Sequence, residues 1–516
     1  MKSLFTILIS LAFINSYATR VSVKDYGAKG DGISIDSVAI KRAIYSGATT
    51  IFFPKGKYNI SKCMLIVKSG ETIYGETGAV ILSSGVRFRA GSYPSTLAAA
   101  VTVVGNNVSV HDLSIVSTDD QKASYVGITI QNAANVVIRN CIIKGFALIG
   151  IRNNGTNNFL CTSNQITHIG SPGSVLKDST SLIYAAPYAM SGSGAYMKFT
   201  ENNIDSIGNW TNRSIYSNGA GIYETGIKII VYGNRIFEFG AVAIKIFSSP
   251  RARISNNYIE TNSTSPGSAG CTGIITDEEG QGNGMGAKVD SNIVIAKNNF
   301  TYGIYAASGS KSYSITYNFI DMKNFEVTSG MAFERSEDGI VASNTIVADA
   351  GNIHKNFGIY ITNQFSGTGI AGVKNLSFTN NIISNVAYGY YLSGAQDISI
   401  KGGKVSMDSI SPSACIFIRP FNVASSNISI SGVTFISKSP GYIYNIADSS
   451  ASLHVEKINV ARNYIYSNGN YWFIGAGNKS IHTVNDYDVL GKCQLNENYT
   501  NIKSEISHSI IRNKKG

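Results

Sequence analysis

The stretches CTSNQI (161–166), FTENNI (199–204) and VYGNRI (231–236) share one pattern. An apolar residue, two variable residues, an asparagine and one variable residue are followed by another apolar residue. The pattern returns as ISNNYI (254–259), IAKNNF (295–300), ITYNFI (315–320), VASNTI (341–346), FTNNII (378–383) and VARNYI (460–465), and with the asparagine replaced as IRNCII (138–143) and IKGGKV (400–405). Such recurrence indicates a repeat architecture in which each unit belongs to one coil.

A second unit, glycine or alanine followed by apolar and variable residues in alternation, lies between the asparagine units. It occurs as GITIQ (127–131), AIKIF (243–247), GMAFE (330–334) and GYYLS (389–393). Period-two alternation in both units is typical of short strands with one buried face. A repeat of about 20–26 residues with short strands and no room for a helix predicts an all-β, right-handed, single-stranded parallel β-helix.

The fixed asparagine has a physical reason in such a fold. Asparagine tolerates the left-handed backbone that a tight turn requires, and its amide can hydrogen-bond to the asparagine one coil away. The sequence therefore predicts a ladder of stacked amides along the axis.

The chain before the repeats has a different character. VSVKDYGAKGDGISIDSVAIKRAIYSGATTIFFPKGKYNIS (21–61) holds a Gly-Asp-Gly turn, a short amphipathic helix with Asp36 as its expected N-cap, and a strand followed by a turn. The first coil of a solenoid exposes unpaired strand edges, and a helix lying across it would cover them. We expect this segment to be an N-terminal cap.

This segment resembles the N-terminal motif of the pectate lyase superfamily, which includes polygalacturonase-like enzymes and tailspike-type proteins. The matching residues are Asp25, Tyr26, Gly27, Ala28, Gly30, Asp31, Gly32, Pro54, Gly56 and Tyr58. The resemblance implies a parallel β-helix, and tailspike relatives imply a homotrimer as one alternative. The polygalacturonase motifs Asn-Thr-Asp, Asp-Asp, Gly-His-Gly and Arg-Ile-Lys do not occur here in that order. The reaction is therefore not implied by the resemblance.

Four segments follow from these patterns. Residues 1–18 read as a signal peptide, 19–62 as the cap, 63–485 as the β-helix, and 486–516 as a C-terminal cap or tail. Lys2, the apolar run after it and the small residues Ser16 and Ala18 suit signal cleavage, and a retained N-terminal anchor is the alternative. We expect a secreted or periplasmic protein without membrane insertion after cleavage.

The chain carries a formal net charge of +11, with only 15% charged residues. A basic exported protein suits an acidic polysaccharide as partner and not nucleic acid. The 6 cysteines and 6 histidines are dispersed, so free cysteines are expected and a zinc site is not.

The repeat predicts which residues share a face. With the glycine or alanine as position one, positions three and five point outward, so Asp277 and Glu334 fall in one column with the coil of Tyr305 between them. Coils stack about 4.8 Å apart, which separates these backbones by roughly 9–10 Å. That lies near the upper end of the separation of about 6.5–9.5 Å in inverting glycosidases. The expected catalytic residues are Asp277, Glu334 and the neighbouring Glu278.

Substrate-binding residues are expected beside them. Lys245 lies one coil before Asp277, and Tyr305, Tyr360 and Tyr223 would offer ring faces to sugars. The coil near residue 221 is ambiguous by one position: the glycine places Thr225 in the column, and the eleven-residue offset places Glu224 there. The alternative for the acids at 277–279 is a calcium or turn cluster, so calcium is a possible cofactor.

Three functions remain open. The first is a glycoside hydrolase that cleaves an extracellular or capsular acidic polysaccharide with paired carboxylates. The second is a polysaccharide lyase that uses calcium and a lysine or arginine base, for which Lys245, Arg251 and Arg253 are the candidates. The third is a non-catalytic β-helix that binds polysaccharide or serves exopolysaccharide biosynthesis or export.

Overall fold

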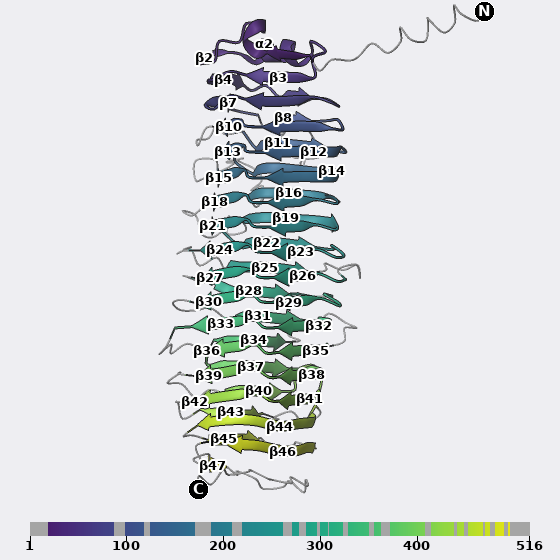
Figure 1. Ribbon diagram of the computed structural model, residues 1–516, viewed down its shortest axis with the longest axis vertical. Coiled ribbons are helices and arrows are strands. Elements are labelled where there is room, and N and C mark those ends of the chain that lie inside the picture. The colour runs from purple at the N-terminus through teal and green to yellow at the C-terminus, as the bar shows by residue number, and fades with distance from the viewer. Residues whose placement is uncertain are drawn as a thin grey trace, which may run out of the picture.

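The computed structural model describes residues 19–86, 99–117, 124–170, 187–208, 219–261, 271–277, 285–296, 300–307, 309–322, 329–349, 356–362, 372–407, 414–437, 441–447, 453–467, 470–474, 480–489 and 494–495. Their strands wind into one tall right-handed solenoid, and each strand pairs in parallel with strands of the coils before and after it (Figure 1). The predicted parallel β-helix is confirmed.

Each coil contributes to three faces, here called A, B and C. Face A contains β5 (Leu65–Val67), β8 (Ala99–Val103), β11 (Val126–Gln131), the first part of β14 (Ile149–Thr162), β16 (Tyr188–Ala195), β19 (Ala220–Ile227), β22 (Val242–Phe247), β25 (Cys271–Asp277), β28 (Phe300–Ala306), β31 (Ser329–Glu334), β34 (Phe357–Thr362), β37 (Tyr388–Ser393), β40 (Ala414–Arg419), β43 (Tyr442–Ile446), β45 (Asn470–Ile474) and β47 (Gln494–Leu495).

Face B contains β1 (Arg20–Ser22), β3 (Thr50–Phe53), β6 (Thr72–Gly75), β9 (Val108–His111), β12 (Ala134–Arg139), the second part of β14, β17 (Lys198–Thr200), β20 (Ile230–Tyr232), β23 (Arg253–Ser255), β26 (Lys288–Asp290), β29 (Ser314–Thr316), β32 (Glu337–Ala342), β35 (Val373–Thr379), β38 (Ala395–Lys401), β41 (Ser425–Ser431), the first part of β44 (Val455–Ser467) and β46 (Ser480–Asp488).

Face C contains β2 (Asp31–Ile35), β4 (Gly56–Ser61), β7 (Ala79–Ser83), β10 (Ser114–Ser117), β13 (Ile142–Lys144), β15 (Gln165–Ile169), β18 (Asn203–Ile207), β21 (Arg235–Phe239), β24 (Tyr258–Thr261), β27 (Ile293–Ala296), β30 (Phe319–Met322), β33 (Thr345–Ala348), β36 (Ile382–Ser384), β39 (Lys404–Met407), β42 (Thr434–Ser437) and the second part of β44. Pairing of β45 with β47 carries the coils past residue 485, where the sequence predicted the cap or tail to begin.

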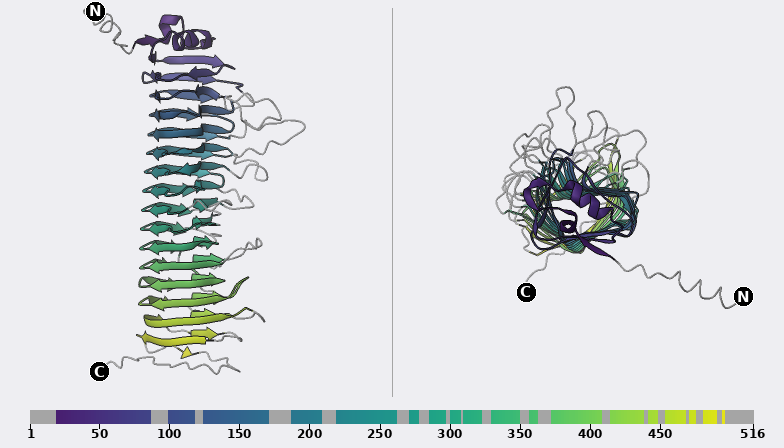
Figure 2. Two further views of the ribbon diagram at one scale, coloured as in Figure 1. Left: turned by 90° about the vertical axis from the view of Figure 1, so that its right-hand side faces the viewer. Right: turned by 90° about the horizontal axis from the view of Figure 1, so that it is seen from above.

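The N-terminal cap has the expected helix. The 3-10 helix η1 (Val23–Tyr26) and the α-helix α2 (Ser37–Ile44) lie across the first coil, with Ile40, Ala43 and Ile44 buried (Figure 2). Asp36 makes no side-chain bond to the helix. Its carboxylate instead accepts the N–H groups of Lys29 (2.7 Å) and Gly30 (3.1 Å), so it holds the preceding turn.

Tyr58 links the turn to the first coils. Its buried ring contacts the Gly30 region, where a Cβ would lie 2.9 Å from Tyr58 Cε1, and its hydroxyl donates to the Pro54 carbonyl at 2.7 Å. Gly30 also has a φ of +66°, which favours glycine. These contacts explain why the motif residues Gly30, Pro54 and Tyr58 occur together.

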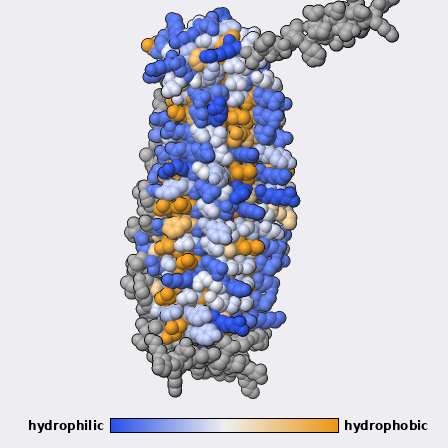
Figure 3. Space-filling model, viewed as in Figure 1, coloured by the Kyte–Doolittle hydropathy of each residue, from blue (hydrophilic) through white to orange (hydrophobic). Residues whose placement is uncertain are grey.

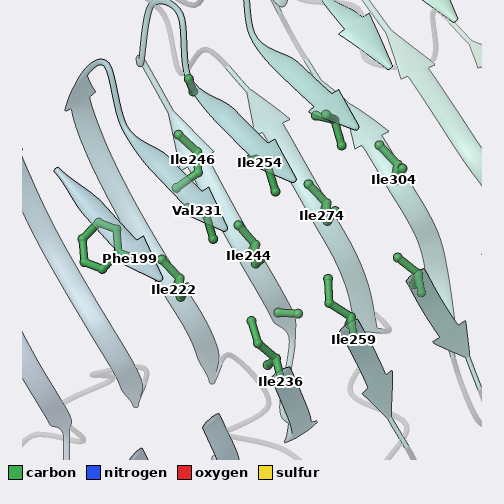
Figure 4. Close-up of a cluster of buried hydrophobic side chains, with 14 of the residues drawn as sticks. Phe199, Ile222, Val231, Ile236, Ile244, Ile246, Ile254, Ile259, Ile274 and Ile304 are labelled. Atoms are coloured by element: carbon green, nitrogen blue, oxygen red, sulfur yellow. The ribbon is translucent and has the colours of Figure 1, made fainter. Parts of the chain in front are cut away.

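The core fills the inside of the solenoid with aliphatic side chains from all three faces. Figure 4 shows members from successive coils in rows, among them Ile222, Ile244, Ile274 and Ile304 of face A. All four are fully buried. Because every coil repeats the same register, outward side chains also recur in rows along the axis (Figure 3).

The asparagine ladder runs between faces B and C. Its members are Asn164, Asn202, Asn234, Asn257, Asn292, Asn318, Asn344 and Asn381, each bonded to the next. The Asn202 amide donates to Asn234 Oδ1 at 2.9 Å and to the Cys161 carbonyl at 3.0 Å, while its own Oδ1 accepts two bonds from Asn164. The predicted ladder is confirmed.

Two details of the ladder prediction need correction. The ladder residue in the coil of β27 is Asn292 and not Asn298 of the IAKNNF unit, which lies outside the described residues. The ladder asparagines also lack the left-handed backbone that was expected of them. The residue before each one has it, as in Ser163 (φ 55°), Glu201 (φ 56°) and Ser343 (φ 56°).

Loss of a ladder amide is expected to destabilise the fold. Asn202→Ala leaves buried donors and acceptors of three neighbours without their partner, which should lower the free energy of unfolding by at least about 2 kcal/mol. The matched control is Asn203→Ala, since Asn203 is exposed and adjacent; its effect should stay within about 0.5 kcal/mol. Urea unfolding measures both, and equal effects would contradict the ladder's role.

Candidate functional site

The predicted acidic column exists in the backbone of face A. Ile275 pairs with Tyr305, and Tyr305 pairs with Ala332 in the next coil. Asp277 and Glu334 each follow by two residues, so they lie in one column two coils apart. The Asp277 side chain and all of Glu278 lie outside the described residues. Glu334 is therefore the acid whose surroundings define the site.

Glu334 is a shielded carboxyl at the outer side of face A. Its exposed fraction is 3%, and the Tyr305 hydroxyl of the preceding coil donates a hydrogen bond to Oε2. The other oxygen, Oε1, is buried and has no hydrogen-bond partner among the described residues. Unsatisfied buried polar atoms are rare in folded proteins, and each needs an explanation, such as a catalytic role or a bound water or ion.

A second tyrosine, Tyr302, lies near this acid. The rings of Tyr302 and Tyr305 lie 4.8 Å apart. Burial raises the pKa of Tyr302 to about 12, with smaller contributions from Tyr360 and Glu334. Tyr302 therefore stays protonated at neutral pH and can act as a hydrogen-bond donor beside Glu334.

A set of aromatic side chains lies on face A in the coil before this acid and in the coils after it toward the C-terminus. We call it the aromatic platform; it consists of Tyr302, Tyr305, Phe357, Tyr360, Tyr388, Tyr391 and Phe417. Neighbouring ring centroids include Phe357 to Tyr360 at 4.9 Å and Tyr391 to Phe417 at 4.6 Å. Of these residues, the sequence predicted Tyr305 and Tyr360 as ligand contacts.

Tyr391 and Phe417, which were missed, lie in the row of Tyr360. The other missed residues, Tyr302, Phe357 and Tyr388, share one position, directly before the glycine of the face A unit. That glycine packs inward, since a Cβ on Gly303 would lie 2.7 Å from Ile320 Cγ2 and one on Gly358 would lie 2.4 Å from Ile383 Cγ2. The residue after the glycine also points inward, so the alternation breaks at this pair. The residue before the glycine therefore faces outward. The recurrent aromatic–glycine pair was the available signal.

The other predicted binding residues form a second group in earlier coils. Lys245 Nζ lies 5.3 Å from the ring centroid of Tyr223 and 5.5 Å from that of Phe247, and the Tyr223 ring also contacts Tyr188 at 5.0 Å. Lys245 and Tyr305 occupy the same row two coils apart, since both align with Ile275. The structure thus brings Lys245 and Tyr223 onto the same face as Glu334.

Glu224 does not belong to the outer surface. It pairs with Ile246 of the inward row, its exposed fraction is 1%, and Asn153 Nδ2 donates to its Oε2 at 2.8 Å. Thr225 pairs with Phe247 and occupies the outer column. The register given by the glycine is correct, and the one that placed Glu224 outside is wrong.

The cations expected for a lyase lie elsewhere, apart from Lys245. Arg253 belongs to β23 on face B, where its Nε lies 3.5 Å from Asp290 Oδ1, and Arg251 lies just before that strand with a φ of 60°. In the described ranges, no group of three or more histidines, cysteines or acids is placed to hold a metal ion. The loop with Glu278 is outside these ranges.

Cys63, Cys141, Cys161, Cys271 and Cys415 are free thiols. Burial raises the pKa of the Cys141 thiol to about 12, so it stays protonated and unreactive at neutral pH. None of the helices in the described part of the chain has the length and apolar character needed to cross a membrane.

Comparison with known proteins places the similarity mainly in the cap and the fold. Residues 20–86 match a sequence family described as rhamnogalacturonase A/epimerase, pectate lyase-like. A 117-residue part is 31% identical to a non-secreted LysM effector of Penicillium expansum, covering 20% of this chain and 8% of the effector. The chain thus spans a small part of the curated relative that it matches.

Several solved structures align with much of this chain at low sequence identity. The adhesin PfbA of Streptococcus pneumoniae has a TM-score of 0.44 and 14% identity, with 84% of this chain and 93% of that chain covered. The family 28 exopolygalacturonase of Yersinia enterocolitica has a TM-score of 0.41 and 14% identity over 86% and 78%. DFA-IIIase from Arthrobacter chlorophenolicus has a TM-score of 0.48 and 13% identity over 74% and 94%.

The buried Glu224 generates a prediction about pH. Burial raises the pKa of Glu224 well above its usual value, and the hydrogen bond from Asn153 offsets this only in part. A raised folded-state pKa means that the folded state loses stability as the pH rises above the unfolded value of about 4.3.

Glu224→Gln keeps an acceptor for Asn153 and cannot ionise. Thermal unfolding should show that the melting temperature of the variant rises relative to that of the wild type between pH 4 and pH 8. A difference in melting temperature that is the same at both pH values would show that Glu224 does not titrate with folding.

Proposed function

Because this chain has the parallel β-helix fold of the pectate lyase superfamily, we propose that it is a secreted glycoside hydrolase. Its substrate is an extracellular or capsular acidic polysaccharide that binds along the outer side of face A. The observation that carries this proposal is Glu334, a carboxyl buried on that face with one oxygen held by Tyr305 and the other without a partner in the described part of the chain. The match of residues 20–86 to a family named partly for a rhamnogalacturonase supports a carbohydrate ligand.

Hydrolysis requires an acid and a base on opposite sides of the scissile bond. Glu334 acts as the general acid, and the Tyr305 hydroxyl orients its buried carboxyl group. Asp277 acts as the general base, from a backbone position two coils away, or roughly 9–10 Å. That spacing suits an inverting reaction, in which a water molecule lies between the base and the sugar. Glu278 is the alternative base.

The aromatic platform and the charge of the protein supply binding. Tyrosine rings present apolar faces on which sugar rings stack, and their hydroxyls add hydrogen bonds. Tyr305 and Tyr360 lie in the coils directly before and after that of Glu334, so the acid has a ring on each side along the axis. Lys245 on the same face and the net charge of +11 attract an anionic polymer.

The lyase alternative has less support. Of the three cations considered as its base, Arg251 and Arg253 are not on face A, so only Lys245 is left, and the acids at 277–279 would have to hold the calcium. A purely binding protein would use the same platform without cleavage. The products therefore distinguish the three functions.

The test uses a panel of acidic polysaccharides with two readouts, reducing ends and ultraviolet absorbance of unsaturated sugars. The wild type should release reducing ends without absorbance, and Glu334→Gln should lower the rate at least about 100-fold, since a general acid contributes 10²–10⁴-fold. The control is Glu337→Gln. Glu337 lies three residues on, on face B, and is paired with Lys311 and Lys374.

Full activity in Glu334→Gln would refute the assignment of the acid. Products that absorb in the ultraviolet would show that the reaction is elimination and not hydrolysis. Binding without any product would show that the protein only binds polysaccharide.

A further inference from the structure

The aromatic platform ends at a cation that no part of the proposed chemistry uses. Arg419 is the last residue of β40 and pairs with Ser393, which follows Thr362 in the outer column of Glu334. Arg419 thus lies in that column three coils beyond Glu334, or roughly 14 Å along the axis. An acid and a cation therefore stand at two fixed positions on one aromatic surface.

The Arg419 side chain is held in one orientation. Its guanidinium carbon lies 5.2 Å from the ring centroid of Tyr391 and 5.2 Å from that of Phe421. Its Nε donates to Ser393 Oγ at 3.1 Å, and Ser393 is fully buried. The guanidinium group lies against the two rings, and its Nε is hydrogen-bonded. The two terminal nitrogens are therefore the atoms that can bind a ligand.

No carboxylate is paired with Arg419 among the residues that the structure describes. An immobilised guanidinium loses little side-chain entropy on binding, and its planar fork matches a carboxylate with two parallel hydrogen bonds. A lysine at this position would offer a point charge without that geometry. The arrangement fits a carboxylate better than a neutral hydroxyl group.

Aromatic side chains lie on face A in the coils between Glu334 and Arg419. Tyr360 and Tyr391 are 5.3 Å apart, and Tyr391 and Phe417 are stacked with an interplanar angle of 13°. Burial raises the pKa of Tyr391 to about 12, and Arg419 opposes that shift, which places the two groups in electrostatic contact. A sugar chain lying on these rings would extend from the acid to the cation.

We propose that Arg419 forms a separate subsite for the carboxylate of a uronic acid, three coils from Glu334. The subsite selects chains that carry a carboxylate at that distance from the reacting bond. This inference rests on the proposed function for its carbohydrate ligand, but it concerns recognition and does not require turnover.

The experiment measures binding by calorimetry in the Glu334→Gln background. The probes are oligomers of galacturonic, glucuronic and mannuronic acid, each with its methyl-esterified, uncharged counterpart. At least one acidic oligomer should bind more tightly than its ester. Arg419→Gln should lower the affinity for that acidic oligomer at least about tenfold and leave the affinity for the ester unchanged.

Two further variants complete the design. Arg419→Lys should restore only part of the affinity, because it keeps the charge and loses the fork. Lys245→Gln, in an earlier coil of the same face, should lower the affinity for the acidic oligomer by a smaller factor than Arg419→Gln does and should leave the affinity for the ester unchanged. Melting temperatures show whether each variant is folded.

Equal losses of acid and ester affinity in Arg419→Gln, an unchanged affinity for both, or a wild type that does not prefer acidic probes would each overturn the proposal. If the preference for acid over ester depends on Arg419 but the protein cleaves no polysaccharide, the subsite is upheld and the hydrolase function is refuted.

Discussion

The buried asparagine ladder is the constraint on which the rest of the structure depends. Each amide donates to the next asparagine of the ladder and to a backbone carbonyl, so a coil cannot slip by one residue without breaking bonds on both sides. Such a slip would also turn every core side chain outward. A fixed register between coils is what makes residues far apart in sequence, such as Tyr305 and Glu334, permanent neighbours.

The glycine of the face A unit is the second constraint, and it shapes the outer surface. Core side chains from face C pack directly over it, as Ile320 does over Gly303, and leave no room for a Cβ. The backbone therefore turns two consecutive positions inward and one additional position outward. Tyrosine or phenylalanine at that additional position widens the aromatic surface beside Glu334. Packing inside the solenoid thus determines what the outside can bind.

Most of the fold was predictable because both repeat units carry period-two patterns and a fixed asparagine. The column of Asp277 and Glu334 followed from the same counting. Asn292 was missed because a nearby Asn-Asn pair imitates the unit. Glu224 was ambiguous because its coil has one residue fewer than the other coils between the glycine and the asparagine unit. The aromatic residues before the glycines and the orientation of Asp36 depend on packing and turn contacts that alternation alone does not encode.

The central claim is that face A beside Glu334 is the ligand-binding surface. A crystal structure of the Glu334→Gln protein with a bound acidic oligosaccharide tests it most directly. The account predicts sugar rings lying along face A, against Tyr305 and Tyr360, with the chain parallel to the solenoid axis. A ligand bound on face B or face C, or at either end of the solenoid, would contradict it.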